Sequence, residues 1–439
     1  MKPRLVRPLR PGLDRLEDRR LLSSGITPVE LKTAYGLNNV LLSAPGGSVV
    51  GNGAGQTIAL VEAYNDPYLA HDLVTFDQTY NIPNPNFQVV NLGGNVANPG
   101  WALEETLDVE WAHALAPYAS ILVVEAKSQT RQALLNAVNV ARQAPGVSVV
   151  SMSWGFSEVR NEAAFNTYFR TPANHQGVTF FAASGDNGTQ GGVQWPSAAP
   201  DVVSVGGTTI QLNAFGGIAS ETTWVSSGGG YSKRQAEPSF QYAVQASGRR
   251  STPDVAFDGD PNTGVQVYET ALATGQGSWQ VVGGTSLGTP AWAAIIAIVD
   301  QGRALQGYGS LDGSSQTLPA LYALPSSDFN PIPPLAYHTV GSATTSALTS
   351  TGRGSPHGPT LITDLVSFTI TGTVGSPASL VQAQAAGRAR PAAARDRHDR
   401  AIPSAILDHG QTRAHPAGPA RFQQAKHPRS TKTSREPHP

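Results

Sequence analysis

Short apolar runs rich in β-branched residues alternate along this chain with longer segments of helical periodicity. The apolar runs are Thr57–Val61, Ile121–Glu125, Val147–Met152, Val178–Ala182 and Val202–Val205, and the helical segments lie near Asp66–Tyr80, Leu103–Ala116, Arg131–Gln143 and Asn161–Gln176. Strands that alternate with helices favour a parallel sheet, because parallel neighbours need a crossover connection. We therefore predict an α/β fold with a doubly wound, mostly parallel sheet and helices on both faces. Functional residues of such folds gather beyond the carboxyl ends of the strands.

The composition indicates one sizeable globular domain. The 439 residues are 40% hydrophobic and only 14% charged, with 46 Gly and 33 Pro, which is typical of a loop-rich enzyme with a large core. The absence of cysteine excludes disulfides and thiolate metal sites, and no apolar run is long enough for a transmembrane helix. The net charge of −1 hides two basic ends and an acidic centre. An acidic centre argues against nucleic acid as the main partner.

Ser286 is the candidate nucleophile. It lies in the Gly/Ser/Thr-rich turn Gly284–Pro290, which leads directly into the apolar helical run Pro290–Val299. A serine in this position sits at a helix N-terminus, where free backbone N–H groups and the helix dipole favour a developing negative charge.

None of the ten histidines is a convincing base for this serine. Seven lie in low-complexity or Pro/Ser/Thr-rich sequence, and no His-Gly-x-His-type segment accompanies His71, His113 or His175. We expect these three to be surface or core-edge residues.

A pair of carboxyl groups is the alternative base. Glu104 and Asp108 are spaced i,i+4 on a predicted helix, so their Cβ atoms lie about 5–6 Å apart on one face. Carboxyl groups this close share a proton, and one pKa rises. Alone, such a pair is usually a solvated helix face, and Asp186, in Ser184-Gly-Asp, would be a turn residue. Glu62 either extends this carboxyl network towards Asp108, with Trp154 nearby, or is a plain strand-end acid.

The order Glu-x-x-x-Asp, Ser-Gly-Asp and Gly-Thr-Ser-x-x-x-Pro resembles the sedolisin family of serine-carboxyl peptidases, which have a subtilisin-like fold. The resemblance runs from about Ile26 through Ser286 and its helix. Further matching segments are Ile58–Glu62, Ser151–Gly155, Gln194–Ser197, Val205–Thr208, Ser227–Ser232 and Pro253–Ala256.

The resemblance implies a role for each matching residue. Ser286 would be the nucleophile, Glu104 its general base, Asp108 the residue that orients Glu104, and Asp186 the oxyanion-hole residue. Two extended segments would pair with a bound peptide as an added strand; they are Ser153, Trp154 and Gly155, and Ser227, Gly228 and Gly229.

These roles predict an acid-acting, monomeric serine endopeptidase that cleaves proteins or peptides through an acyl-enzyme. Asp186 can stabilise an oxyanion only while it is protonated, so we expect a maximum between about pH 3 and 5. Two alternatives stay open. One is a catalytically impaired peptide-binding or surface protein on the same fold; the other is a Ser-His-Asp subtilase that uses His71, His113 or His175.

The ends of the chain differ from the family pattern. We predict that residues 1–25 form an export-type, disordered segment. Leu16–Ser23 resembles an N-terminal motif of exported planctomycete-type bacterial proteins, and this predicts an extracellular or cell-envelope location. The peptidase domain is predicted over residues 26–371, and the large pro-domain typical of sedolisins is not expected before Ile26. Residues 372–439 are rich in Ala, Arg, Pro and His, and we predict a disordered basic tail.

A family calcium site is expected within residues 325–360, but this region is divergent. Thr351–Pro356 matches the family's Thr-Gly-x-Gly-Ser-Pro, whereas Leu348 stands where an aspartate is expected and Pro331 where another ligand is expected. Calcium prefers six to eight oxygen ligands, several from carboxylates. Asp328 is the weak candidate for a substitute ligand.

Overall fold

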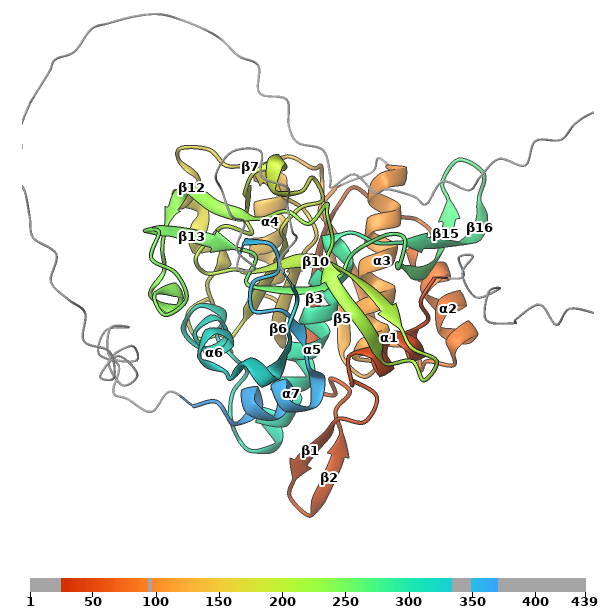
Figure 1. The fold of residues 1–439 in the computed structure, drawn as a ribbon. Coiled ribbons are helices and arrows are strands. Elements are labelled where there is room, and N and C mark those ends of the chain that lie inside the picture. Colours follow the sequence, from red (N-terminus) through yellow and green to blue (C-terminus); the bar gives the residue numbers. More distant parts are fainter. Residues whose placement is uncertain (1–24, 94–96, 334–348, 370–439) are drawn as a thin grey trace, which may run out of the picture.

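A twisted central sheet organises the protein (Figure 1). The computed structural model describes residues 25–93, 97–333 and 349–369. The strand order is β11-β10-β8-β6-β3-β5-β4, with β14 also paired to β10. The strands are β3 (Thr57–Ala63), β4 (Phe87–Asn91), β5 (Ser120–Ala126), β6 (Val147–Met152), β8 (Thr179–Ala183), β10 (Val203–Leu212), β11 (Ile218–Thr223) and β14 (Val255–Asp258). All of these pair in parallel except β11, which is antiparallel to β10. The predicted α/β class is therefore confirmed.

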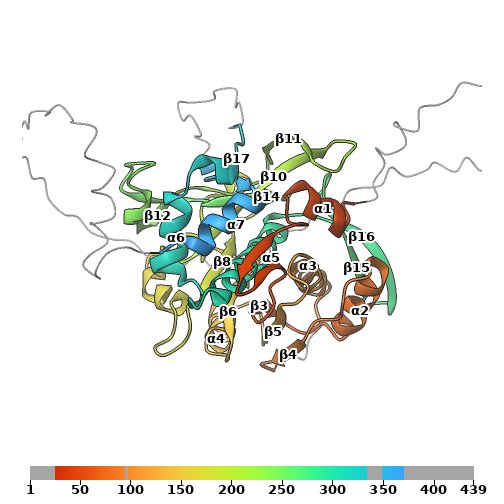
Figure 2. The same cartoon turned by 90° about the horizontal axis from the view of Figure 1, so that it is seen from below.

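Helices cover both faces of this sheet, as Figure 2 shows. Helices α3 (Pro99–Leu115) and α5 (Thr285–Leu305) pack together over one face, whose core includes Ile58 and Leu60 of β3. Helix α4 (Arg131–Ala141) packs on the opposite face, against Ala59 and Val61. Neighbouring strand residues enter different cores because successive side chains point to opposite faces.

Smaller elements surround this framework. The helices are α1 (Pro28–Ala34), α2 (Leu69–Tyr80), α6 (Leu318–Ala323) and α7 (Gly358–Ser367). Strands outside the sheet pair as β1 (Leu41–Ala44) with β2 (Gly47–Val50), β7 (Phe156–Ser157) with β9 (Gln194–Trp195), β12 (Gly230–Ala236) with β13 (Arg249–Thr252), β15 (Val265–Ala271) with β16 (Gln276–Val282), and β17 (Phe329–Asn330) with β18 (Ser355–Pro356). Short turns are the 3₁₀-helices η2 (Glu162–Phe169), η3 (Thr189–Gly191), η4 (Ser239–Gln241) and η6 (Ser326–Asp328), and the π-turn η5 (Gly313–Thr317).

The predicted helix over Asn161–Gln176 is wrong. Only η2 forms there, as a 3₁₀-helix that ends at Phe169. Pro172 lacks an N–H donor and pushes Thr171 out of the α region. Asn174 adopts a positive φ of 63°, which is incompatible with a continuing helix.

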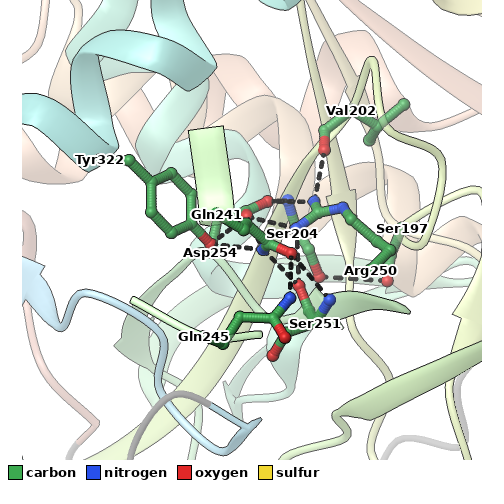
Figure 3. A network of polar contacts seen from close by, with 9 residues as sticks. All are labelled: Ser197, Val202, Ser204, Gln241, Gln245, Arg250, Ser251, Asp254 and Tyr322. Atoms are coloured by element: carbon green, nitrogen blue, oxygen red, sulfur yellow. Dashed lines mark hydrogen bonds and ion pairs between the residues drawn. The ribbon is translucent and has the colours of Figure 1, made fainter. Parts of the chain in front are cut away.

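A buried ion pair joins Arg250 of β13 to Asp254, the residue directly before β14 (Figure 3). Arg250 contacts both Asp254 oxygens, at 2.6 and 2.5 Å, and both side chains are fully buried. The Tyr322 hydroxyl donates to Asp254 at 2.7 Å and accepts from Gln241 at 2.7 Å. Because both charges are paired and hydrogen-bonded, their burial is tolerated.

The terminal predictions lie outside the described residues. The export-type motif, the whole of the predicted tail and Leu348 are among them, so the domain boundaries at 26 and 371 stay predictions. Among the described helices, none has the length and apolarity needed to cross a membrane.

Candidate active site

The candidate nucleophile lies at the start of α5. Ser286 is the second residue of that helix and is fully buried, and Gly284 precedes it with a φ of 127° that favours glycine. Pro290 has no N–H to bond the Ser286 carbonyl four residues earlier. The Ser153 hydroxyl lies 3.3 Å from that carbonyl oxygen. The Gly-Thr-Ser-x-x-x-Pro sequence thus prepares a contact between α5 and the end of β6.

Glu104 comes to Ser286 from α3, which packs against α5. Burial and the Asp108 charge raise the pKa of Glu104 well above its usual value, while the nearby Ser286 hydroxyl acts to lower that pKa. Neither the Glu104 oxygens nor the Ser286 hydroxyl makes a hydrogen bond of standard geometry to another described residue. Glu104 and Ser286 are therefore neighbours, and the Ser286 hydroxyl makes no hydrogen bond of standard geometry to another described residue.

Asp108 lies behind Glu104 and accepts from Ser153. The Ser153 Oγ is 2.7 and 3.0 Å from the two Asp108 oxygens. Burial raises the pKa of Asp108 to about 8, against the opposing effect of hydrogen bonds from Ser153 and Glu62.

Glu62, near the end of β3, is a fully buried member of the same group. Burial and then the charges of Asp108 and Glu104 raise the pKa of Glu62 well above its usual value. Trp154 fixes this strand end, because its indole N–H donates to the Val61 carbonyl at 2.9 Å. The structure thus brings Glu62, Glu104 and Asp108 together behind Ser286.

Asp186 contacts the turn that carries Ser286, through the neighbouring residue Thr285. It follows β8 after Ser184 and Gly185, and its Oδ1 accepts from both the N–H and the hydroxyl of Thr285, each at 2.8 Å. Burial raises the pKa of Asp186 to about 6, although both Thr285 hydrogen bonds lower it. This carboxyl group therefore holds its proton to a higher pH than a free aspartate.

The first predicted substrate-binding segment also supports the site. The Ser153 hydroxyl points to Asp108, and the Trp154 side chain is buried. A Cβ on Gly155 would lie 2.3 Å from the Gln194 Oε1, so glycine permits this contact.

The second segment packs against the loop that carries Asp186. The Gly228 N–H donates to the Gly185 carbonyl at 2.6 Å, and its own carbonyl accepts from Ser184 at 2.9 Å. The Ser227 hydroxyl accepts from the Gly207 N–H at 2.8 Å, and a Cβ on Gly229 would lie 2.3 Å from the Thr349 carbonyl oxygen. Substrate contacts of either segment stay predictions.

Three further buried or half-buried carboxyls, Asp66, Glu105 and Glu125, were not singled out from the sequence. Glu125 on β5 is the register partner of Glu62 on β3, and Glu105 of α3 is fully buried. Burial and then the Glu125 charge raise the pKa of Glu105 well above its usual value. Burial also raises the pKa of Asp66 to about 6. The signal in the sequence was a third acid, Glu105, directly beside Glu104.

The three histidines considered as alternative bases have other contacts. The His113 Nε2 lies 2.8 Å from the Pro83 carbonyl oxygen and 3.3 Å from Asp77. His71 contacts Asp72 at 2.9 Å, and His175 contacts the Ala144 carbonyl oxygen at 3.0 Å. These contacts give no support to an imidazole base for Ser286.

The described part of the calcium region does not supply a calcium ligand set. Asp328 is 1% exposed, and its Oδ2 has no hydrogen-bond partner among the described residues. Burial and then the Asp364 charge raise the pKa of Asp328. Within residues 25–93, 97–333 and 349–369, no three Asp, Glu, His or Cys side chains are grouped so as to hold a metal. Two neighbouring carboxyls fall short of what calcium prefers.

Comparison with known proteins identifies the family. Residues 93–316 match the model of the subtilase family. Kumamolisin of Bacillus sp. (strain MN-32) is 33% identical over 338 residues, which cover 70% of this chain and 56% of the relative. Sedolisin of Pseudomonas sp. (strain 101) is 27% identical over 311 residues, which cover 63% of this chain and 50% of the relative. The chain thus spans about half the length of these curated relatives.

A solved structure agrees with these sequence similarities. Pseudomonas sedolisin, a serine-carboxyl proteinase complexed with two molecules of pseudo-iodotyrostatin, superimposes with a TM-score of 0.65 at 26% identity, covering 77% of this chain and 97% of that chain. The chain belongs to the subtilase family, a family of serine peptidases. Within that family it is a member of the sedolisin group.

Proposed function

We propose that the protein is an acid-acting serine-carboxyl endopeptidase with Ser286 as nucleophile. The observation that carries this proposal is the approach of Glu104 to the Ser286 hydroxyl at the N-terminus of α5, with Asp108 directly behind it. Protein or peptide substrates follow from the reaction class.

In the proposed reaction, Ser286 Oγ attacks the peptide carbonyl carbon while its proton passes to Glu104. The carbonyl oxygen becomes an oxyanion, held by the Ser286 N–H and the protonated Asp186. Glu104 then returns the proton to the leaving amine, which gives an acyl-enzyme. Water, deprotonated by Glu104, releases the acid product and restores Ser286.

We expect the group formed by Glu62, Glu104 and Asp108 to carry a single negative charge in the active enzyme. The first of these carboxyls to ionise is stabilised by hydrogen bonds from its protonated neighbours, and further ionisation is opposed by like charge and burial. With a proton on Asp108, the Ser153 hydroxyl can accept from that proton and donate to the Ser286 carbonyl. The group therefore supplies a base without accumulating charge in the core.

The upper pH limit of the proposed activity follows from Asp186. Its pKa is raised to about 6 by burial, so the oxyanion donor is present below that pH and is lost above it. The proposal requires the first ionisation of the Glu62, Glu104 and Asp108 group to occur below that pH, at a carboxyl stabilised by hydrogen bonds from its protonated neighbours, even though burial raises the pKa of each member. Activity should consequently be highest in acid and fall as pH rises through about 6.

Hydrolysis of a denatured protein substrate across roughly pH 2–8, a range that brackets carboxyl titration, tests the proposal. Ser286→Ala and Glu104→Gln should each abolish nearly all turnover while the protein stays folded. A wild-type profile that peaks above pH 7 would contradict the assigned roles. A peptide aldehyde separates the peptidase from a silent peptide-binding protein, since only the former forms a hemiacetal with Ser286.

Export is a further part of the proposal, based on the N-terminal motif at Leu16–Ser23. An acid-acting peptidase outside the cytoplasm would meet its working pH without endangering cytoplasmic proteins. Fractionation of the native host, followed by immunodetection, tests this location.

A further inference from the structure

The two oxygens of Asp186 lie in different surroundings. Oδ1 accepts two hydrogen bonds of 2.8 Å, from the N–H and from the hydroxyl of Thr285. Oδ2 lies over Gly284, because a Cβ built on that glycine would be 2.8 Å from Oδ2 and 3.6 Å from the Ser286 nitrogen. Oδ2 is therefore the oxygen that lies next to Gly284, two residues before Ser286 in the chain.

The Thr285 hydroxyl is held in one orientation. It accepts from the Gly185 N–H at 3.1 Å, which leaves its single hydrogen for Asp186 Oδ1. Thr285 is fully buried in the first turn of α5, and its carbonyl accepts from the Thr289 hydroxyl at 2.8 Å. A buried side chain with both of its polar contacts filled does not reorient freely.

We propose that Thr285 is a positioning residue that places the catalytic proton of Asp186 on Oδ2. This inference rests on the proposed function, in which Asp186 donates that proton to the oxyanion. A proton on Oδ1 would point at two donors, so the carboxylic acid is stable only with its proton on Oδ2. The Oδ2–H and the Ser286 N–H then form a matched pair of donors on one side of the nucleophile.

The same contacts set the pH at which the proton is lost. Hydrogen bonds from Thr285 favour the ionised carboxylate and lower the pKa of Asp186, which burial raises. The Asp186 charge in turn raises the pKa of Glu104, on the neighbouring helix α3. Removal of the Thr285 hydroxyl should therefore raise the pKa of Asp186 while it leaves the proton less well placed.

Thr285→Val tests this pair of effects, because valine keeps the backbone N–H and the side-chain shape but loses the hydroxyl. The maximal kcat should fall about tenfold. The alkaline limb of the pH profile should move up by about one pH unit, which is the size of one hydrogen bond to a charged group. Thr285→Ser, which keeps the hydroxyl, should restore both the rate and the limb.

Thr289→Val is the matched control, since it removes a buried hydroxyl from the same helix without touching Asp186. Its alkaline limb should stay at the wild-type position. The proposal would be overturned if the alkaline limb of the Thr285→Val profile stayed at the wild-type pH or moved to lower pH. It would also be overturned if Thr289→Val showed an equal shift.

Titration of the Asp186 carboxyl by infrared difference spectroscopy, assigned with Asp186→Asn, separates this inference from the proposed function. If wild type shows no peptidase activity at any pH, the proposed function fails, but the carboxyl titration still reports on Thr285. A higher Asp186 pKa in Thr285→Val than in Thr289→Val would support the contact, and equal values would refute it.

Discussion

Asp300 should make the protein less stable as the pH rises towards neutrality. This carboxyl lies in the middle of α5 and is fully buried. Its Oδ1 accepts from the Leu311 N–H at 2.8 Å, while Oδ2 has no hydrogen bond of standard geometry to a described residue. Burial raises the pKa of Asp300 from 3.8 to about 8, despite opposing effects of Leu311, Arg303 and Ser148.

The size of the effect follows from linkage. Below pH 3.8 the Asp300 carboxyl is protonated in both the folded and the unfolded state, so its contribution to stability is fully present. As the pH rises, the unfolded chain loses the proton and the folded chain keeps it, which lowers the free energy of unfolding by about 1.4 kcal/mol per pH unit. Between its ordinary pKa and pH 7, the loss from this one group amounts to about 4 kcal/mol.

Asp300→Asn should remove this dependence, because the amide keeps the acceptor for Leu311 and does not titrate. Urea unfolding at pH 4, 5, 6 and 7, in a Ser286→Ala background that prevents self-digestion, gives the difference between the two proteins. From pH 4 to pH 7, the free energy of unfolding of the asparagine variant should rise relative to that of its Asp300 parent by about 4 kcal/mol. A difference that is independent of pH would refute the argument, since Asp300 would then be ionised in the folded protein.

Asp312 provides a control, because its contribution to stability should depend on pH in the opposite direction. Burial alone would raise its pKa, but hydrogen bonds from Ser315, Thr171 and Ser314 outweigh burial and lower the pKa. Its stabilising contribution is therefore present above its ordinary pKa and is lost as the pH falls. Asp312→Asn should be least harmful in acid and increasingly harmful towards neutral pH.

Three further substitutions test other parts of the fold. Asp254→Asn leaves the buried Arg250 guanidinium without its counter-charge and should lower the free energy of unfolding by about 3–5 kcal/mol in urea denaturation. Thr27→Ala breaks the capping box of α1 and should lower it by about 1 kcal/mol in the same assay. Gly229→Ala would place a Cβ 2.3 Å from a carbonyl oxygen and should reduce the thermal midpoint and the peptidase activity, whereas Gly309→Ala, with open space around it, should change neither.

The buried strands could be predicted from the sequence because their apolar runs are continuous. The predicted run Val147–Met152 matches β6 at both ends. In contrast, β4 and β11 were not predicted, because each is partly exposed and carries polar residues such as Asn91 and Glu221. The end of β10 also extends beyond its apolar run, where Gly206 and Gly207 interrupt the hydrophobic signal. Edge strands are held by their neighbours more than by their own composition.

The order of the motifs along the chain indicated the residues of the candidate site. The sequence did not indicate that these residues would be buried. Taken alone, the spacing of Glu104 and Asp108 is typical of a solvated helix face. In the structure every residue from Trp101 to Leu115 of α3 is buried, so this helix has no solvated face over that stretch. Glu105, one residue from Glu104, was therefore missed, because amphipathic reasoning assigns neighbouring positions to different faces.

The burial of carboxyl groups links the proposed chemistry to the pH dependence of stability. Burial raises the pKa values of Glu104 and Asp186, and of Glu105 and Asp300, which take no part in the proposed reaction. Each of these groups favours the folded state while it is protonated. Acid therefore supplies the proton on Asp186 and removes the charges that burial disfavours. If this common cause holds, variants that neutralise Asp300 should retain their fold at higher pH, yet their proposed peptidase activity should still decline above about pH 6, because that limit belongs to Asp186.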